Sequence, residues 1–390
     1  MPLREPVVGR DPLEDLRVSS PLELLFDLCF VVAVGQAGEG LREAIAGGAF
    51  ARGLANFLLV FFAIWWPWVN YTWFASAYAT DDVVHRFLTF VQIAGVLVVA
   101  AGVPRIFASF DFSVAVAGYV IMRGALVLEW LRAAHDDRAG RAVALRYGLG
   151  VAVVQLLWVV RLGVPGTPGL ILLVGVAILE HGVPILAERS GPETPWHPGH
   201  IAERYGLFTI IVLGECVLAA TTAIQTALGA ATPTAALIEL AIGGLILVFG
   251  LWWAYFKDTE TISRDQPFAV QIAWGYGHYV IFVSIAAIGA GLQLAADSTV
   301  DPARVPAIDA GLLVGAGTAI FLTGVSVLHR RWHGRDPALV GIAALVLLAL
   351  GWAAQWMGAP LAIVAIGLVV AAMLAGTVIR SGDPVHDEPS

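Results

Sequence analysis

Charged residues are scarce in this chain. Only 13% of its 390 residues are Asp, Glu, Lys or Arg, whereas 58% are hydrophobic and the mean hydropathy is +0.80. Soluble domains contain about 25% charged residues, so this composition argues against a soluble globular protein. Apolar segments of about 20 residues cross the hydrocarbon layer as helices. The sequence therefore predicts an all-α, polytopic integral membrane protein built as a helical bundle.

Cysteines and basic clusters are equally sparse, and each scarcity removes a class of function. Cys29 and Cys216 both lie inside predicted spans, so no disulfide framework is indicated. No run of lysine or arginine of the kind that binds nucleic acid occurs. The Gly-x-Ser-x-Gly, His-Glu-x-x-His and Gly-x-x-x-x-Gly-Lys motifs are absent as well. We therefore expect no enzyme activity, no cofactor and no nucleic-acid partner.

Apolar segments separated by turn-rich breaks predict about twelve transmembrane helices. A cytoplasmic lead-in (residues 1–19) precedes the transmembrane domain (residues 20–379), and a cytoplasmic tail (residues 380–390) follows it. The expected spans cover residues 20–38, 54–78, 87–104, 112–132, 143–162, 168–187, 203–227, 234–256, 267–294, 307–328, 337–355 and 359–379.

The placement of arginine and lysine supports an even number of spans. With the amino terminus inside, sixteen of these residues fall in inside segments and five in outside segments, while Arg123 lies within a span. Positive residues gather in cytoplasmic loops, so both termini are expected in the cytoplasm. A missed or invented span would reverse this bias for the rest of the chain.

Matching patterns in the first and seventh spans favour an internal repeat. Each span has a glycine followed by an amide or an acid at similar depth, at positions 35–36 and 214–215. Duplication would give two halves, 20–187 and 200–379, in a six-plus-six parallel repeat. The alternative is chance, because apolar runs resemble one another.

Acidic residues inside predicted spans are the best guide to function. Glu23 and Asp27 lie one helical turn apart in the first span, and Glu215 lies near the middle of the seventh. A carboxylate at bilayer depth costs a few kcal/mol or more, so it usually faces a bundle interior or a water-filled path. We expect Asp27 and Glu215 to form a central polar pair, with Arg123 as counter-ion. The expected polar core comprises Glu23, Asp27, Asn70, Arg123, Glu180, His181, Glu203, Arg204 and Glu215. The alternative is that these groups pair with one another, for instance Arg123 with Asp27 or Glu215, and only lock the bundle.

The segment from His197 to Glu203 has a spacing that resembles a set of metal ligands. His197, His200 and Glu203 are three residues apart, but no fourth ligand lies nearby. A helix opening with two interfacial histidines explains the pattern equally well. We expect no metal, with His197 and His200 as the weak candidates.

Three strings closely resemble the bacterial low temperature requirement A family. They are PLELLFDLCFVVA (21–33), WVNYTWFA (68–75) with TDD (80–82), and HIAERYGLFTIIVLGE (200–215). The similarity is strong over about the first two thirds of the chain, while the last three spans look generic. The matching motif positions are Glu23, Asp27, Asn70, Asp81, Asp82, His200, Glu203, Arg204 and Glu215. Cys29 and Cys216 are mild departures that leave the acids intact.

The resemblance implies a multi-pass protein of the bacterial plasma (inner) membrane, linked by name to growth in the cold. It brings no established substrate or mechanism, so no catalytic residue is carried over. Together with the intramembrane acids, it favours a transporter or channel for a proton, a cation or a small solute. The alternative is a non-transporting membrane scaffold or lipid-related accessory protein whose buried acids are structural. Expected partners are membrane lipid and an ion or small solute; the sequence indicates no oligomeric state.

Overall fold

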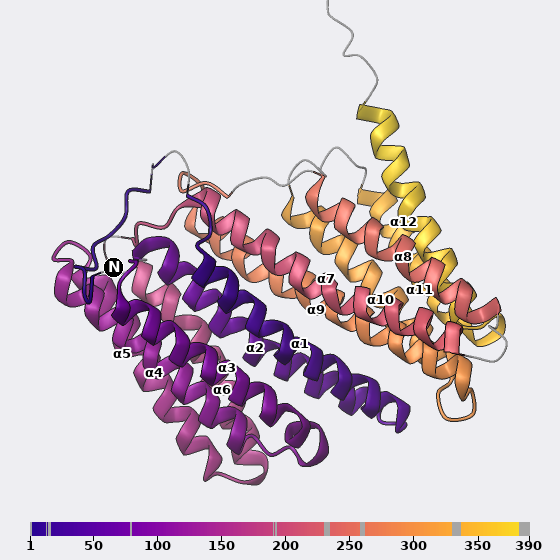
Figure 1. Ribbon diagram of the computed structural model, residues 1–390, viewed down its shortest axis with the longest axis horizontal. Coiled ribbons are helices and arrows are strands. Elements are labelled where there is room, and N and C mark those ends of the chain that lie inside the picture. Colours follow the sequence, from indigo (N-terminus) through magenta and orange to yellow (C-terminus); the bar gives the residue numbers. More distant parts are fainter. Residues whose placement is uncertain are drawn as a thin grey trace, which may run out of the picture. The chain divides into compact units, whose positions relative to one another are not determined.

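The fold was analysed in a computed structural model that describes residues 2–12, 14, 17–78, 80–189, 191, 193–229, 235–257, 262–329 and 337–381. Every regular element in these ranges is an α-helix, and twelve helices are long and apolar enough to cross a membrane (Figure 1). The predicted all-α bundle of about twelve spans is confirmed. The helices are α1 (Pro21–Ala46), α2 (Phe50–Tyr78), α3 (Val83–Ser109), α4 (Ser113–Asp136), α5 (Arg141–Leu162), α6 (Gly166–Arg189), α7 (Pro198–Gly229), α8 (Ala235–Phe256), α9 (Phe268–Val300), α10 (Ala307–Leu328), α11 (Pro337–Met357) and α12 (Ala359–Ser381).

Helix α1 runs well past residue 38, where the hydropathy pattern placed its end. Gly40 lies inside the helix against the ring of Phe107, where a β-carbon would clash. Gly40 therefore permits a close helix contact and does not end the helix.

The chain divides into two compact units. Unit 1 comprises residues 1–40, 56–208 and 261–265, and unit 2 comprises residues 41–55, 209–260 and 266–390. The unit boundaries fall inside α1, α2 and α7. The expected halves, 20–187 and 200–379, stay a prediction.

Small residues set the helix spacing within each unit. In unit 1, a β-carbon at Gly95 of α3 would lie 2.7 Å from the carbonyl oxygen of Gly118 in α4. In unit 2, a β-carbon at Gly315 of α10 would lie 2.6 Å from the carbonyl oxygen of Leu347 in α11. Backbones that approach this closely are the usual way in which membrane helices pack.

Buried charge is confined to unit 1 among the residues that the structure describes. All buried arginine, aspartate and glutamate side chains lie there: Arg17, Glu23, Asp27, Asp82, Arg123, Glu129, Glu180 and Arg204. The candidate functional site is therefore in unit 1.

Candidate functional site

Helix α1 begins with a capping box that holds its first acid in place. Pro21 takes the first helical position, where its missing N–H is not needed. The Ser20 hydroxyl accepts a hydrogen bond from the N–H of Glu23 at 3.3 Å, and Oε2 of Glu23 accepts one from the N–H of Ser20 at 2.7 Å. This reciprocal arrangement satisfies donors at the helix terminus. It leaves Oε1 of Glu23 available for partners in the interior.

Helix α7 also begins with a side-chain cap, before the position at which hydropathy placed the span. The ring Nδ1 of His197 accepts a hydrogen bond from the N–H of His200 at 3.1 Å, and Pro198 takes the first helical position. His200 and Arg204 then lie one turn apart on one face of α7. Both side chains are 0% exposed.

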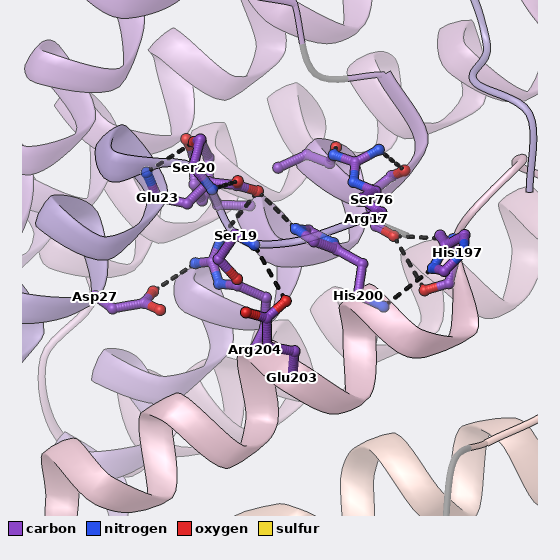
Figure 2. Close-up of polar contacts among 12 residues, drawn as sticks. Arg17, Ser19, Ser20, Glu23, Asp27, Ser76, His197, His200, Glu203 and Arg204 are labelled. Carbon is purple, nitrogen blue, oxygen red and sulfur yellow. Dashed lines mark hydrogen bonds and ion pairs between the residues drawn. The ribbon is translucent and has the colours of Figure 1, made fainter. Parts of the chain in front are cut away.

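These two helix starts bring four ionisable side chains together, which we call the α1–α7 tetrad: Glu23, Asp27, His200 and Arg204. The imidazole Nε2 of His200 lies 3.0 Å from Oε1 of Glu23, and Nη1 of Arg204 lies 3.1 Å from the same oxygen. The Nη2 atom of Arg204 donates to Oδ1 of Asp27. Figure 2 shows the side chains of the two α1 acids meeting those of α7.

The charges within the tetrad do not balance. Two carboxylates face one guanidinium, so the group has a formal charge of −1 while His200 is neutral. A buried charge in a low-dielectric region is expensive unless it is compensated. One additional proton, on His200 or on a carboxyl group, makes the tetrad neutral. The tetrad therefore has the composition of a proton-binding site.

Two further ionisable side chains, Arg17 and Glu203, flank the tetrad. Arg17 donates to the carbonyl oxygens of Ser76 at 2.7 Å and Ala75 at 2.5 Å, near the carboxyl end of α2. Burial, reinforced by nearby Arg10, lowers the pKa of Arg17 to about 10, so it remains charged at neutral pH. Glu203, half-buried, accepts from the N–H of Ser19 at 3.1 Å. Arg17 also interacts electrostatically with Glu23, so the charge of −1 refers to the four side chains of the tetrad alone.

Aromatic side chains of α2 enclose the tetrad. The indole Nε1 of Trp68 donates to Oδ1 of Asp27 at 2.7 Å. The Tyr71 ring stacks on Phe26 with centroids 3.8 Å apart, and the guanidinium carbon of Arg204 lies 5.8 Å from the centroid of the same ring. These rings exclude water from the ion pairs, which strengthens every electrostatic interaction there.

A cavity of about 580 Å³ adjoins the tetrad at Glu23. It lies between the segment that precedes α1, α1 itself and the start of α3. Its lining residues are Arg10, Arg17, Val18, Ser20, Pro21, Leu22, Glu23, Leu25, Thr80, Asp81, His85, Arg86 and Phe90. Glu23 thus joins the buried tetrad to a polar space large enough for water and a small solute.

Arg123 belongs to a separate cluster, which corrects the expected pairing. Its Nη2 lies 3.1 Å from Oε1 of Glu180, and neither side chain is accessible. Glu180 also accepts from the Tyr119 hydroxyl at 3.0 Å and from Trp158 Nε1 at 2.9 Å. The cation that pairs with Asp27 is therefore Arg204. Arg123 and Glu180 neutralise each other, which agrees with the alternative that paired charges in the spans only hold the helices together.

The remaining polar positions expected on α2 and α6 lie apart from the tetrad's ion pairs. The Asn70 side chain donates to the carbonyl oxygen of Trp66 in its own helix at 2.8 Å. The His181 ring stacks on Phe62 and packs against Trp66, with centroids 4.5 and 4.3 Å away. Both side chains thus contribute to helix packing.

Glu215 lies in unit 2 and is half-buried. A β-carbon at Gly289 of α9 would lie 3.2 Å from the β-carbon of Glu215. Within the described ranges, its carboxyl group has no hydrogen bond or ion pair. The expected pairing of Asp27 with Glu215 stays a prediction.

The two histidines weighed as weak metal candidates have protein partners. His197 Nε2 lies 2.9 Å from the carbonyl oxygen of Glu14, and its Nδ1 caps α7. His200 contacts Glu23. No cluster of three His, Cys, Asp or Glu side chains arranged for a metal is found in the described part of the chain.

Two features of the tetrad were not expected from the sequence. Arg204 was expected in the polar core but not as the cation that pairs with Asp27, and His200 was expected as a family motif position and a weak metal candidate but not as part of that core. A signal was present, because His200 and Arg204 repeat the i, i+4 spacing of Glu23 and Asp27. Two helices that present complementary charges at the same spacing form two ion-pair layers when they pack together.

The fold and the tetrad define a multi-pass helical membrane protein with a buried ionic cluster. The chain belongs to the bacterial low temperature requirement A protein (LtrA) family, whose profile matches residues 18–376. The match includes the last three spans, which looked generic in the sequence. An uncharacterized protein of Rhizobium meliloti (strain 1021) is 26% identical over 340 residues, which cover 82% of this chain and 79% of the relative.

Proposed function

We propose that this protein is a transporter or channel that moves a proton, a cation or a small solute across the bacterial plasma membrane, with both termini in the cytoplasm. It acts without a cofactor and performs no enzymatic chemistry. Its partners are membrane lipid and the transported species. The observation that carries the proposal is the unbalanced charge of the α1–α7 tetrad beside a polar cavity.

The tetrad supports the proposal because it couples proton binding to helix packing. A proton on Glu23 or His200 cancels the excess negative charge. A neutral Glu23 no longer attracts Arg204 as an ion, so one of the two layers between the starts of α1 and α7 weakens. Functional intramembrane carboxylates commonly work in this way, as steps in a proton or cation path.

Reconstituted liposomes test the proposal. With an imposed pH gradient and a pH-sensitive dye, Asp27→Asn and His200→Gln are each expected to lower the proton flux about tenfold or more. Parallel assays with cation-sensitive dyes identify a cation that moves instead. The matched control is Glu193→Gln, which removes an exposed glutamate of the same unit. Unchanged proton and cation fluxes in both tetrad variants would refute the assignment.

A second candidate function is a non-transporting scaffold or lipid-related accessory protein. The observation that favours it is that Arg204 bridges both acids, as a purely structural clamp would. Under this alternative, Asp27→Asn lowers the unfolding temperature and changes function only in proportion. A flux defect at a temperature where the variant remains folded separates the two candidates.

A further inference from the structure

A second group of four ionisable side chains connects the start of α3 with the last turns of α4. We call it the α3–α4 tetrad, and its members are Asp82, His85, Glu129 and Arg132. The ring Nδ1 of His85 lies 3.0 Å from Oε1 of Glu129. The guanidinium of Arg132 donates through Nη1 to Oε2 of Glu129 at 3.1 Å and through Nη2 to Oδ2 of Asp82 at 2.6 Å. Asp82, His85 and Glu129 are buried.

The two tetrads share one pattern of contacts. In each, a glutamate touches a histidine ring nitrogen and an arginine, and the arginine also binds an aspartate. Each therefore has two carboxylates against one guanidinium, and each is neutral only with one added proton. The α3–α4 tetrad was not among the residues expected to form the polar core.

Both tetrads reach the same cavity. Glu23 of the first and His85 of the second line its wall. A hydrogen-bonded link runs behind that wall, because the Thr89 hydroxyl donates to the carbonyl oxygen of His85 at 2.9 Å and lies 3.4 Å from the Tyr71 hydroxyl. Since the Thr89 proton is already committed, Tyr71 is the donor in this contact. Tyr71 also carries Arg204 over its ring.

The charged groups around His85 do not neutralise the excess negative charge of the α3–α4 tetrad. Arg86 is paired with Asp81 at 2.8 and 3.0 Å, so this neighbouring pair is neutral. Across the cavity, Arg10 is paired with Glu14 at 2.7 Å, while Arg17 and Glu23 face each other with opposite charge. Tyr71 of α2 carries no charge, because its hydroxyl keeps the proton that it donates to Thr89.

Asp82 is not the proton acceptor. Burial opposes its ionisation, but the N–H groups of Glu5 and His85, together with Arg132, hold the pKa of this carboxyl below its ordinary value. It stays ionised near neutral pH. The additional proton is therefore shared by His85 and Glu129.

We propose that the His85–Glu129 pair is a second proton-binding site on this cavity, so that the protein takes up two protons, one at each tetrad. The inference deepens the proposed function, because it gives the number of protons that the transporter binds. Its test needs no transport, so the two ideas fail separately.

The experiment counts the protons that the purified full-length protein takes up in detergent between about pH 8 and pH 5, the range in which histidine titrates. Glu129→Gln is expected to lower the count by about one, because the tetrad then has one carboxylate against one guanidinium and is neutral without an added proton. His85→Gln leaves Glu129 as the remaining acceptor and is expected to change the count less. The double variant also loses about one proton, and its paired amides retain a hydrogen bond. The matched control, Glu193→Gln, changes an exposed side chain that belongs to neither tetrad and is expected to leave the count unchanged.

The comparison of the proton counts of the single and double variants decides whether His85 and Glu129 share one proton. An unchanged count in Glu129→Gln, or a loss of about two protons in the double variant, would overturn the inference. Elution as a single symmetric peak in size-exclusion chromatography shows that each variant is folded. If the counts match expectation but liposomes show no flux, the proton site stands and the transport proposal falls.

Discussion

The two units of this protein treat buried carboxyl groups in opposite ways. In unit 1, Glu23 and Asp27 are 3% and 0% exposed, and each contacts Arg204. In unit 2, Glu215 is half-buried and its carboxyl group has no polar partner in the described ranges. The comparison shows that hydropathy locates the charged residues that are costly to bury, but does not show which of them have an oppositely charged partner. A buried pair loses much when one member is removed, whereas an unpaired acid can lose its charge at little cost.

The largest effect is expected from Arg204→Gln. This change leaves two buried carboxylates without their shared cation, and breaking a buried ion pair on one side costs about 3–5 kcal/mol. The midpoint of thermal unfolding in detergent should fall steeply. Adding Asp27→Asn to Arg204→Gln should recover part of the loss, since it removes one stranded charge. No recovery in the double variant would show that the two side chains are not coupled.

A smaller effect is expected from Ser20→Ala, which removes one half of the capping box. The N–H of Glu23 loses its acceptor, and the loss of such a cap costs about 1 kcal/mol. Ser20→Thr is the matched control, because threonine keeps a capping hydroxyl and adds no charge beside the tetrad. Equal unfolding temperatures for Ser20→Ala and the wild type would mean that α1 is positioned by its ion pairs alone.

The stability of unit 1 is expected to depend on acidic pH through Asp82. Its folded-state pKa lies below the ordinary value. A carboxyl with a lowered folded pKa contributes stability that is fully present above its unfolded pKa, near 3.9, and is lost as the pH falls through the folded value. Asp82→Asn should therefore flatten the acid side of a plot of unfolding temperature against pH. Asp301→Asn, an exposed control in unit 2, should leave that side unchanged.

The smallest effect on stability is expected from Glu215→Gln. No ion pair is broken, so the free energy of unfolding should change by no more than about 0.5 kcal/mol, as for a typical neutral substitution, and the unfolding temperature should hardly move. The proton flux is the sharper measurement. A flux defect without loss of stability would support the predicted central role of Glu215. A large loss of stability would instead reveal an unrecognised partner and would break the contrast between the units.

Much of the fold was predictable because it depends on local composition. The span expected at 307–328 coincides with α10 (Ala307–Leu328), since proline and charged residues bound its apolar run. The end of α1 was predicted too early, because hydropathy marks only the apolar part of a helix, whereas α1 continues through the charged residues Glu39, Arg42 and Glu43.

The candidate site was predictable only in part. The cost of intramembrane charge pointed directly to Glu23 and Asp27. Their partner Arg204 lies 177 positions away from Asp27. The matching i, i+4 spacing of His200 and Arg204 was a local signal, but spacing alone does not determine which of several helices packs against α1, so Arg123 was expected as the cation. The α3–α4 tetrad was not expected as a group, because Asp82, His85 and Arg132 lie at or near helix ends, where hydropathy does not count a charge as costly.

By itself, the sequence determined the twelve helices and the positions at which charge enters apolar segments. Both follow from the free energy of transferring each residue from water to hydrocarbon, which needs no knowledge of neighbours. Only the tertiary structure decided that Arg204 and not Arg123 compensates Asp27, and that two tetrads of equal composition border one cavity. Coulombic and hydrogen-bond energies depend on distances of a few ångströms, and helix packing alone sets those distances.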